Sequence, residues 1–115
     1  MQVQIFGLRK CPDTRKALRF FAERRVTTHF VDLAERAASL GELTRFAQKF
    51  GVGALIDMGS RRYAELGLGA ARMADDTWLA TLAAEPLLLR TPLTRYEHKL
   101  TVGAAEPEWK AWVTK

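Results

Sequence analysis

Residues 3–18 read VQIFGLRKCPDTRKAL and join an apolar strand, a short basic loop and the start of a helix. Proline is favoured at the first helical position because it has no N–H group to leave unsatisfied and its φ is already helical. Pro12 therefore places Cys11, the only cysteine of the chain, at the N-cap. The unpaired N–H groups and the positive end of the helix dipole point toward this position.

These groups favour a thiolate over a thiol at Cys11, as neighbouring cations also do. Four basic residues flank the cysteine: Arg9, Lys10, Arg15 and Lys16. Because the loop is polar and helix N-termini bind anions readily, the pattern predicts a reactive or anion-binding cysteine. The alternative is that Cys11 is a small buried apolar residue without chemistry of its own.

The composition indicates one globular domain spanning residues 1–115. Apolar residues make up 48% of the chain, which is enough for a hydrophobic core. The net charge of +5 comes from basic residues spread along the chain, which is typical of a solvated surface. A single cysteine excludes an internal disulfide and suits a reducing cytosol, so we expect a cytoplasmic protein. The sequence shows neither a signal-peptide pattern nor a membrane-spanning segment.

The first part of the chain predicts a βαβ unit. Residues 2–6 and 28–32 alternate apolar and polar positions, as strands do. Between them, a helix is expected from Pro12 to about Arg25. Two strands joined by a helix of this length are parallel, because a parallel pair needs a crossover connection.

Residues 40–85 predict a block of helices without a strand. Ser39 and Glu42 form a capping box before the first helix, and Gly51 is expected to end it in the left-handed conformation. A short helix over residues 60–66 follows. A third helix is expected through about residue 85, capped by an aspartate at position 75 or 76.

The chain ends with two strands and a helix. Strands are expected at residues 93–97 and 99–102, joined by a hairpin, and the last helix begins at residues 106–108. Trp109, Trp112 and Val113 form its predicted buried stripe. The order β-α-β, helices, β-β-α is that of an α/β, thioredoxin-like fold with a four-stranded mixed sheet and a helical insertion at about residues 40–85.

Motifs along the whole chain make it similar to the ArsC/Spx family, which includes glutaredoxin-coupled arsenate reductases and the regulator Spx. The resemblance rests on the start, IFG at 5–7 and CPDTRKA at 11–17, and on LLRTPL at 88–93 with LTVG at 100–103. It implies that Cys11 is a nucleophile that attacks arsenate, after which glutathione and glutaredoxin reduce the adduct. It also implies a catalytic role for Arg15 and a cis Pro92 facing the cysteine.

The chain departs from the family pattern beside that proline. Arsenate reductases of this type carry an arginine directly before it, whereas here Thr91 holds the position and the arginine is Arg90. Lys99 lies where the family often has a basic residue, although lysine lacks the bidentate fork of arginine. The predicted residues for binding the oxyanion or substrate are Thr14, Arg90, Thr91, Pro92 and Lys99.

Thr14 stands where Spx-like regulators and dithiol enzymes have a second cysteine. This leaves a monothiol mechanism, in which an external thiol resolves the Cys11 adduct. His29 and His98 lack companions at metal-ligand spacing, so no metal or bound cofactor is expected.

Two main functional hypotheses follow from these patterns. The first is an arsenate reductase-like monothiol oxidoreductase, acting on an oxyanion or a glutathione mixed disulfide with glutathione or glutaredoxin as external reductant. The second is an Spx-like binding module that docks on a transcription partner without catalysis. A relic of the fold without thiol chemistry is a third.

Overall fold

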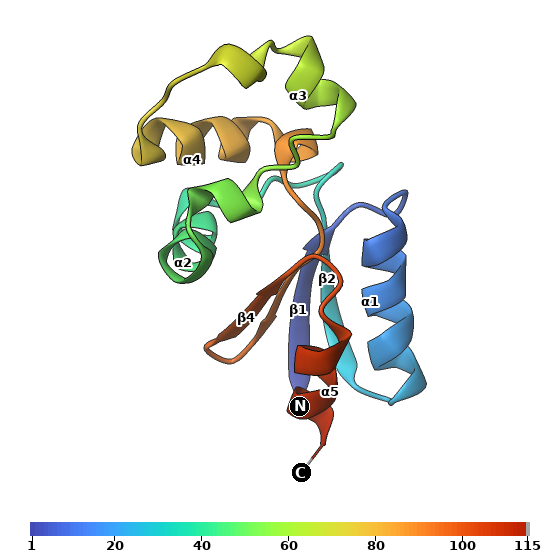
Figure 1. The fold of residues 1–115 in the computed structure, drawn as a ribbon. Coiled ribbons are helices and arrows are strands. Elements are labelled where there is room, and N and C mark those ends of the chain that lie inside the picture. Colours follow the sequence, from blue (N-terminus) through green and yellow to red (C-terminus); the bar gives the residue numbers. More distant parts are fainter. Residues whose placement is uncertain (115) are drawn as a thin grey trace. The chain divides into compact units, whose positions relative to one another are not determined.

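The computed structural model describes residues 1–114, which form two compact units. One, here called the sheet unit, consists of residues 1–32 and 91–114, and the other, the helical unit, is the segment Leu33–Arg90. Figure 1 labels their helices and strands along the chain. The insertion expected at about residues 40–85 lies within the helical unit.

The sheet unit contains four strands: β1 (Gln2–Gly7), β2 (Thr27–Asp32), β3 (Leu93–Tyr96) and β4 (Lys99–Val102). Their order across the sheet is β2-β1-β3-β4. Strand β1 is parallel to β2 and antiparallel to β3, which pairs with β4 in a hairpin. The predicted strands and the parallel βαβ unit are therefore confirmed. None of the described residues 33–90 contributes a strand to this sheet.

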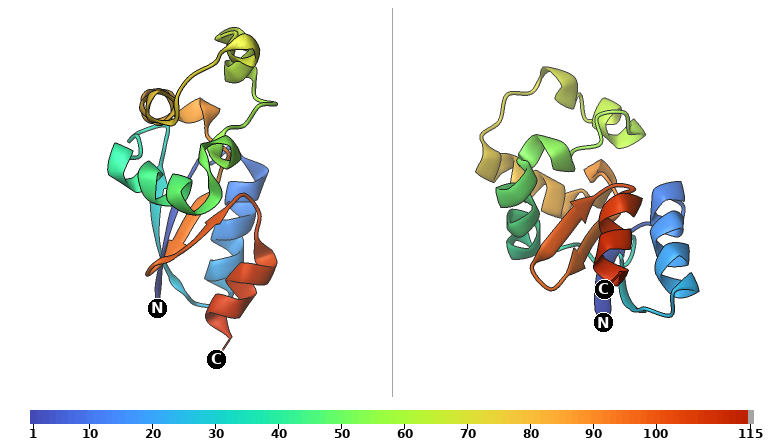
Figure 2. Two further views of the ribbon diagram at one scale, coloured as in Figure 1. Left: turned by 60° about the vertical axis from the view of Figure 1, so that its left-hand side comes forward. Right: turned by 60° about the horizontal axis from the view of Figure 1, so that its bottom comes forward.

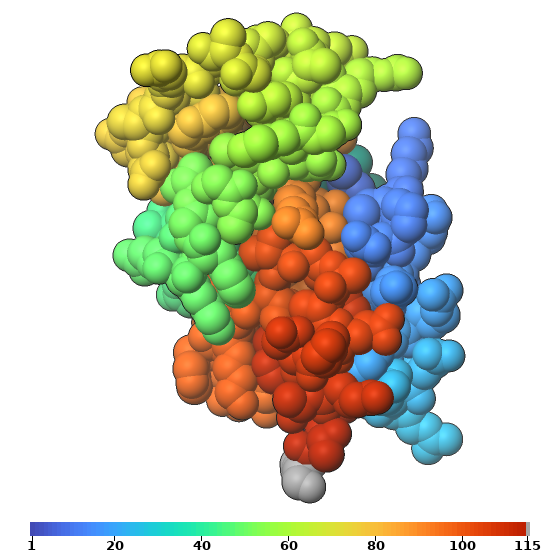
Figure 3. Space-filling model, viewed as in Figure 1, coloured from blue at the N-terminus to red at the C-terminus, as the bar shows by residue number. Residues whose placement is uncertain are grey.

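Two helices, α1 (Pro12–Glu23) and α5 (Glu106–Val113), cover the same face of the sheet (Figure 2). Val3 and Ile5 of β1 pack there in one buried cluster that includes Phe21 of α1 and Trp109 of α5. The indole N–H of Trp109 donates to the Thr101 hydroxyl at 2.9 Å. In Figure 3 the side chains of α5 (red) lie beside those of α1 (blue). The predicted stripe of α5 is confirmed at Trp109, whereas its other two members are only partly buried.

Helix α1 ends in a Schellman motif. The N–H of Arg25 donates to the Ala22 carbonyl at 3.0 Å, and that of Val26 donates to the Phe21 carbonyl at 3.0 Å. Arg25 occupies the position that usually holds glycine, and its φ of 57° lies in the left-handed region. Val26 packs against the core cluster that contains Phe21, which is the hydrophobic contact that accompanies this motif.

The helical unit contains α2 (Leu40–Phe50), α3 (Arg61–Glu65) and α4 (Asp75–Ala84), with short 3₁₀ helices at Val52–Leu55, Leu68–Ala70 and Pro86–Leu88. The capping box of Ser39 and Glu42 at the start of α2 is confirmed. Two stretches of the unit also pair briefly. Ile56 lies opposite Leu89 in an isolated antiparallel bridge, and the N–H of Arg90 donates to the Leu55 carbonyl at 2.8 Å.

Two helix ends of this unit differ from the sequence predictions. Gly51 ends α2 with φ 84° and ψ 150°, so its φ is positive but it is not in the left-handed helical conformation. Neither aspartate caps α4, whose N-cap is Ala74. Asp75 and Asp76 lie inside the first turn instead, where carboxylates stabilise the positive end of the helix dipole. Among the described residues, every helix is too short or too polar to cross a bilayer.

Candidate functional site

Cys11 lies in the loop between β1 and α1, where the sequence predicts it. Its φ and ψ are extended, at −76° and 121°, and Pro12 opens the helix behind it. The N–H of Cys11 donates to the Leu8 carbonyl at 2.9 Å, and its carbonyl accepts the N–H of Arg15 at 3.0 Å. These two bonds hold the cysteine at the helix N-terminus, with the thiol free and partly buried.

A close approach between Gly7 and Thr14 fixes this loop. A Cβ placed on Gly7 would lie 2.5 Å from the Thr14 hydroxyl oxygen and 2.6 Å from its methyl carbon, so only glycine fits. The fully buried Thr14 accepts the N–H of Leu8 at 3.3 Å through its hydroxyl. The end of β1 and the first turn of α1 are thereby locked together around Cys11.

Thr91 faces the cysteine from the other end of the chain. The Cys11 thiol donates to the Thr91 backbone carbonyl, with 3.6 Å between sulfur and oxygen. The predicted cis peptide bond between Thr91 and Pro92 is confirmed. The N–H of Gly103 donates to the Pro92 carbonyl at 2.8 Å, which ties this segment to the residue after β4. Residues 80 positions apart therefore meet at one sulfur atom.

The surroundings of the sulfur lower the pKa of the Cys11 thiol. Burial raises it, but hydrogen bonds from the side chains of Thr91 and Thr14 and from the backbone N–H groups of Thr14 and Asp13 outweigh burial. Such donors act because only the charged sulfur is a strong acceptor, so they favour the thiolate. The side chain of Cys11 makes no capping hydrogen bond as it stands, which suits the weak acceptor strength of a neutral thiol.

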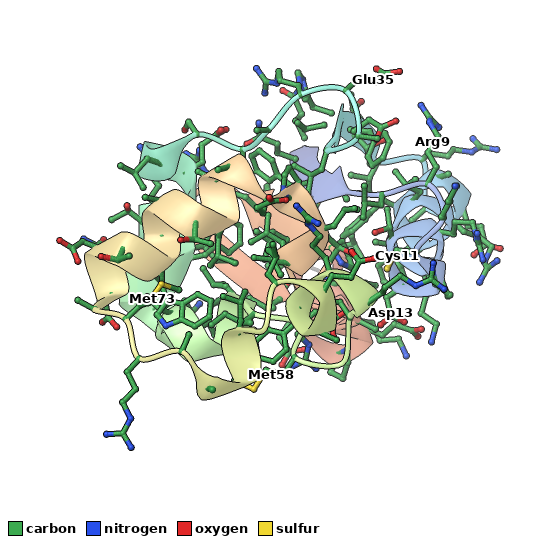
Figure 4. All side chains as sticks on the ribbon, turned by 90° about the horizontal axis from the view of Figure 1, so that it is seen from above. Arg9, Cys11, Asp13, Glu35, Met58 and Met73 are labelled. Atoms are coloured by element: carbon green, nitrogen blue, oxygen red, sulfur yellow. The ribbon has the colours of Figure 1, made fainter. Side chains whose placement is uncertain are left out.

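The neighbouring cations, which the sequence analysis places among the causes of a reactive cysteine, bind other groups. One guanidinium nitrogen of Arg15 lies 3.2 Å and 3.3 Å from the carbonyls of Arg9 and Lys10, to which it donates. The Arg9 guanidinium lies 3.5 Å from the Asp32 carboxylate, and in Figure 4 its side chain extends away from Cys11. Neutral donors, rather than the cations expected from sequence, therefore stabilise the thiolate.

The sheet register does not bring Lys99 to the cysteine. Lys99 pairs with Tyr96, three residues along β3 from Leu93, whose partner Phe6 lies near the Cys11 end of β1. This separation is about 10 Å along the strand. The Lys99 ammonium lies 5.7 Å from the centre of the Tyr96 ring. Sequence position alone could not show this, because it does not reveal which end of the hairpin faces the loop.

Arg90 belongs to the helical unit, where its side chain is exposed and its N–H is bound to Leu55. The sheet unit also carries a polar depression, lined by Gln2, Gln4, His29, Arg95 and Glu97. Gln4 pairs with both His29 and Arg95, so the depression lies over the end of β1 remote from Cys11. The described residues contain no cluster of three or more side chains suited to hold a metal ion.

Sequence reasoning named Thr14 and Thr91 as substrate-binding candidates but missed their contacts with the sulfur. The signal for Thr14 was present, because it lies three residues after an N-cap, where the side chain of a helix faces back toward the cap. Nothing local signals Thr91, since its approach to Cys11 depends on how distant strands pair.

Comparison with known proteins agrees with this geometry. The family model described as "ArsC family" matches residues 6–112. An arsenate reductase of Neisseria meningitidis is 28% identical over 105 residues, covering 89% of this chain and 90% of that protein. The structure of an arsenate reductase from Vibrio cholerae is 26% identical and superposes with a TM-score of 0.83, covering 99% and 98% of the two chains. An ArsC family related protein from Bacteroides fragilis, 21% identical, reaches a TM-score of 0.87 over 96% and 97%. The chain belongs to the ArsC family and has its thioredoxin-like fold.

Proposed function

We propose that this protein is a monothiol oxidoreductase of the arsenate reductase type, with Cys11 as its nucleophile and a glutathione-class thiol as its reductant. The observation that carries the proposal is the placement of Cys11 at a helix N-terminus, where hydroxyl and N–H donors lower its pKa. A thiolate is the nucleophilic form of cysteine, so these donors prepare it for attack. Family membership supports an oxyanion as substrate, since relatives of similar length are named arsenate reductases.

The reaction balances with two external thiols. The Cys11 thiolate displaces one oxygen of arsenate as water and forms a bond from sulfur to arsenic(V). Glutathione then attacks the Cys11 sulfur, its electron pair reduces arsenic to the trivalent state, and a mixed disulfide remains. A second thiol, from glutathione or glutaredoxin, attacks the glutathione sulfur of that disulfide and restores the Cys11 thiolate. Chain residues contribute the nucleophile and the donors around it.

An anionic substrate also needs positive charge, which the neutral donors around Cys11 do not supply. Arg15 and Arg90 are the arginines adjacent in sequence to the two segments that meet at the sulfur. We propose that they assist oxyanion binding, since arginine can hold an oxyanion through two parallel hydrogen bonds. Arg15→Ala and Arg90→Ala are then expected to raise the arsenate concentration needed for half-maximal rate without abolishing Cys11 alkylation.

The direct test incubates the protein with arsenate, glutathione and glutaredoxin and measures arsenite and oxidised glutathione. One oxidised glutathione per arsenite is expected, and Cys11→Ser should abolish both products while keeping the fold, because serine is a good N-cap. Absence of arsenite together with a Cys11 that forms no mixed disulfide would contradict the proposal. A protein inert in both assays would support the Spx-like binding module instead.

A further inference from the structure

Thr91 presents two different groups in the neighbourhood of the Cys11 sulfur. Its backbone carbonyl lies 3.6 Å from the sulfur and accepts the thiol proton. Its side chain, of which only 8% is exposed, carries a hydroxyl that can donate to the same atom. A carbonyl serves only the protonated sulfur, whereas a donating hydroxyl serves the thiolate. One residue therefore carries a partner for each protonation state.

The sheet holds Thr91 in place. Leu93, two residues further on, pairs with Phe6 near the end of β1, and Pro92 accepts the N–H of Gly103 at 2.8 Å. On the other side of the sulfur, the clasp between Gly7 and Thr14 fixes the cysteine loop. Because both segments are anchored to the same strand, the carbonyl and hydroxyl of Thr91 keep their position when the sulfur changes state.

We propose that Thr91 is the positioning residue of the Cys11 sulfur in both halves of a glutathione exchange, holding the thiol through its carbonyl and the thiolate through its hydroxyl. This inference rests on the proposed function, in which Cys11 is first a nucleophile and then a leaving group. In the second half, the thiolate of free glutathione attacks the glutathione sulfur of the mixed disulfide. A new disulfide forms between the two glutathiones, the bond to Cys11 breaks, and its electron pair stays on the Cys11 sulfur.

The hydroxyl of Thr91 meets the sulfur as that negative charge appears. A leaving thiol of lower pKa departs faster, so a donor placed there accelerates resolution. It also directs the attack to the glutathione sulfur, because the better-stabilised thiolate is the one that leaves. The same donor slightly weakens Cys11 as a nucleophile, since intrinsic nucleophilicity falls with pKa.

Thr91→Val separates these effects because it removes the hydroxyl and keeps the carbonyl. Its alkylation by iodoacetamide should reach half its maximal rate at a higher pH than in the wild type. Its plateau rate at high pH should be higher, by about threefold for each unit of pKa gained. Release of Cys11 from a preformed glutathione mixed disulfide, followed by mass spectrometry at fixed glutathione and pH, should be several-fold slower.

Two further variants complete the experiment. Thr91→Ser keeps a hydroxyl and should restore both the pH midpoint and the resolution rate. Thr94→Val makes the same chemical change at another fully buried threonine on β3, whose hydroxyl has no hydrogen-bond partner among the described residues, and should alter neither quantity. If valine at position 91 disturbs the fold, Thr91→Ala removes the hydroxyl with less steric demand and gives the same comparison.

The outcomes distinguish this inference from the proposed function. If Thr91→Val is slow in resolution, shifted in pH and rescued by Thr91→Ser, the positioning role holds. If wild-type Cys11 reacts with glutathione but Thr91→Val matches it in both measurements, the role is overturned and the proposed function stands. Equal impairment of the serine and valine variants would also overturn it, since that marks packing rather than a hydroxyl. Failure of the wild type to form the mixed disulfide would remove both.

Discussion

At the scale of single residues, the reactivity of Cys11 is a competition between burial and neutral hydrogen-bond donors. Burial disfavours the charged sulfur, and the hydroxyls of Thr91 and Thr14 with two backbone N–H groups favour it more strongly. The basic loop, which seems from sequence to supply the charge, binds its own carbonyls and the Asp32 carboxylate. Charge composition therefore identifies the cysteine as special, but the wrong groups are credited with making it so.

The role of Arg15 can be tested by truncation. Arg15→Ala removes the hydrogen bonds from its guanidinium to the carbonyls of Arg9 and Lys10. Because the arginine is not among the groups that shift the thiol pKa, the pH midpoint of Cys11 alkylation should stay within error of the wild type. Hydrogen exchange at the loop amides should become faster. A midpoint displaced to higher pH would show that the cation acts on the sulfur after all.

Thr94 offers a prediction about stability rather than chemistry. Its hydroxyl is fully buried and makes no hydrogen bond to any described residue. A buried polar group without a partner loses its hydration for nothing, and replacement by an apolar group of the same shape removes that penalty. Thr94→Val should therefore raise the free energy of unfolding by about 1 kcal/mol, measured by urea denaturation. A loss of stability would mean that the hydroxyl has a water partner.

At the scale of elements, the site depends on how closely β1 approaches α1. Gly7→Ala would drive a methyl group into the Thr14 side chain, with contacts of 2.5 Å and 2.6 Å to be relieved. Overpacking of this kind commonly costs about 1–3 kcal/mol. The variant should also alkylate at Cys11 with a changed pH profile, because Thr14 is a donor to the sulfur.

A matched glycine variant serves as control. A Cβ on Gly53 meets nothing within 4 Å, so Gly53→Ala should leave stability and alkylation close to wild type. Equal behaviour of the two variants would contradict the proposed clasp between the strand and the helix.

The end of α1 gives a second element-scale prediction. Arg25 adopts φ 57° at the position of the Schellman motif where glycine is usual. Left-handed geometry costs a residue with a Cβ about 1–2 kcal/mol, of which the greater chain entropy of glycine returns part. Arg25→Gly should thus stabilise the protein by about 0.5–1 kcal/mol in thermal or urea unfolding. Arg25→Ala, which keeps the Cβ, should show no such gain.

At the scale of the whole molecule, local patterns predicted the elements and the family resemblance predicted how they assemble. Alternation in residues 2–6 and the proline after Cys11 are local signals, and both gave the right element. Helix starts that depend on one side chain were less secure, since the first turn of α4 holds Asp75 and Asp76 without using either as a cap. The contact between residues 11 and 91 arises from the strand order β2-β1-β3-β4, which no local pattern contains.

The account as a whole stands on the ionisation of Cys11, and the most direct measurement is its alkylation rate by iodoacetamide as a function of pH. Cys11→Ser, which has no cysteine left, is the blank. The donors around the sulfur predict a midpoint below the free-thiol value of about 8.5, and fast reaction at pH 7. Because the folded-state pKa is the lower one, the thiolate adds stability above the free value, and this is lost as pH falls through the folded one. A midpoint at or above 8.5 would show that burial prevails, and the nucleophile assigned here would be an ordinary thiol.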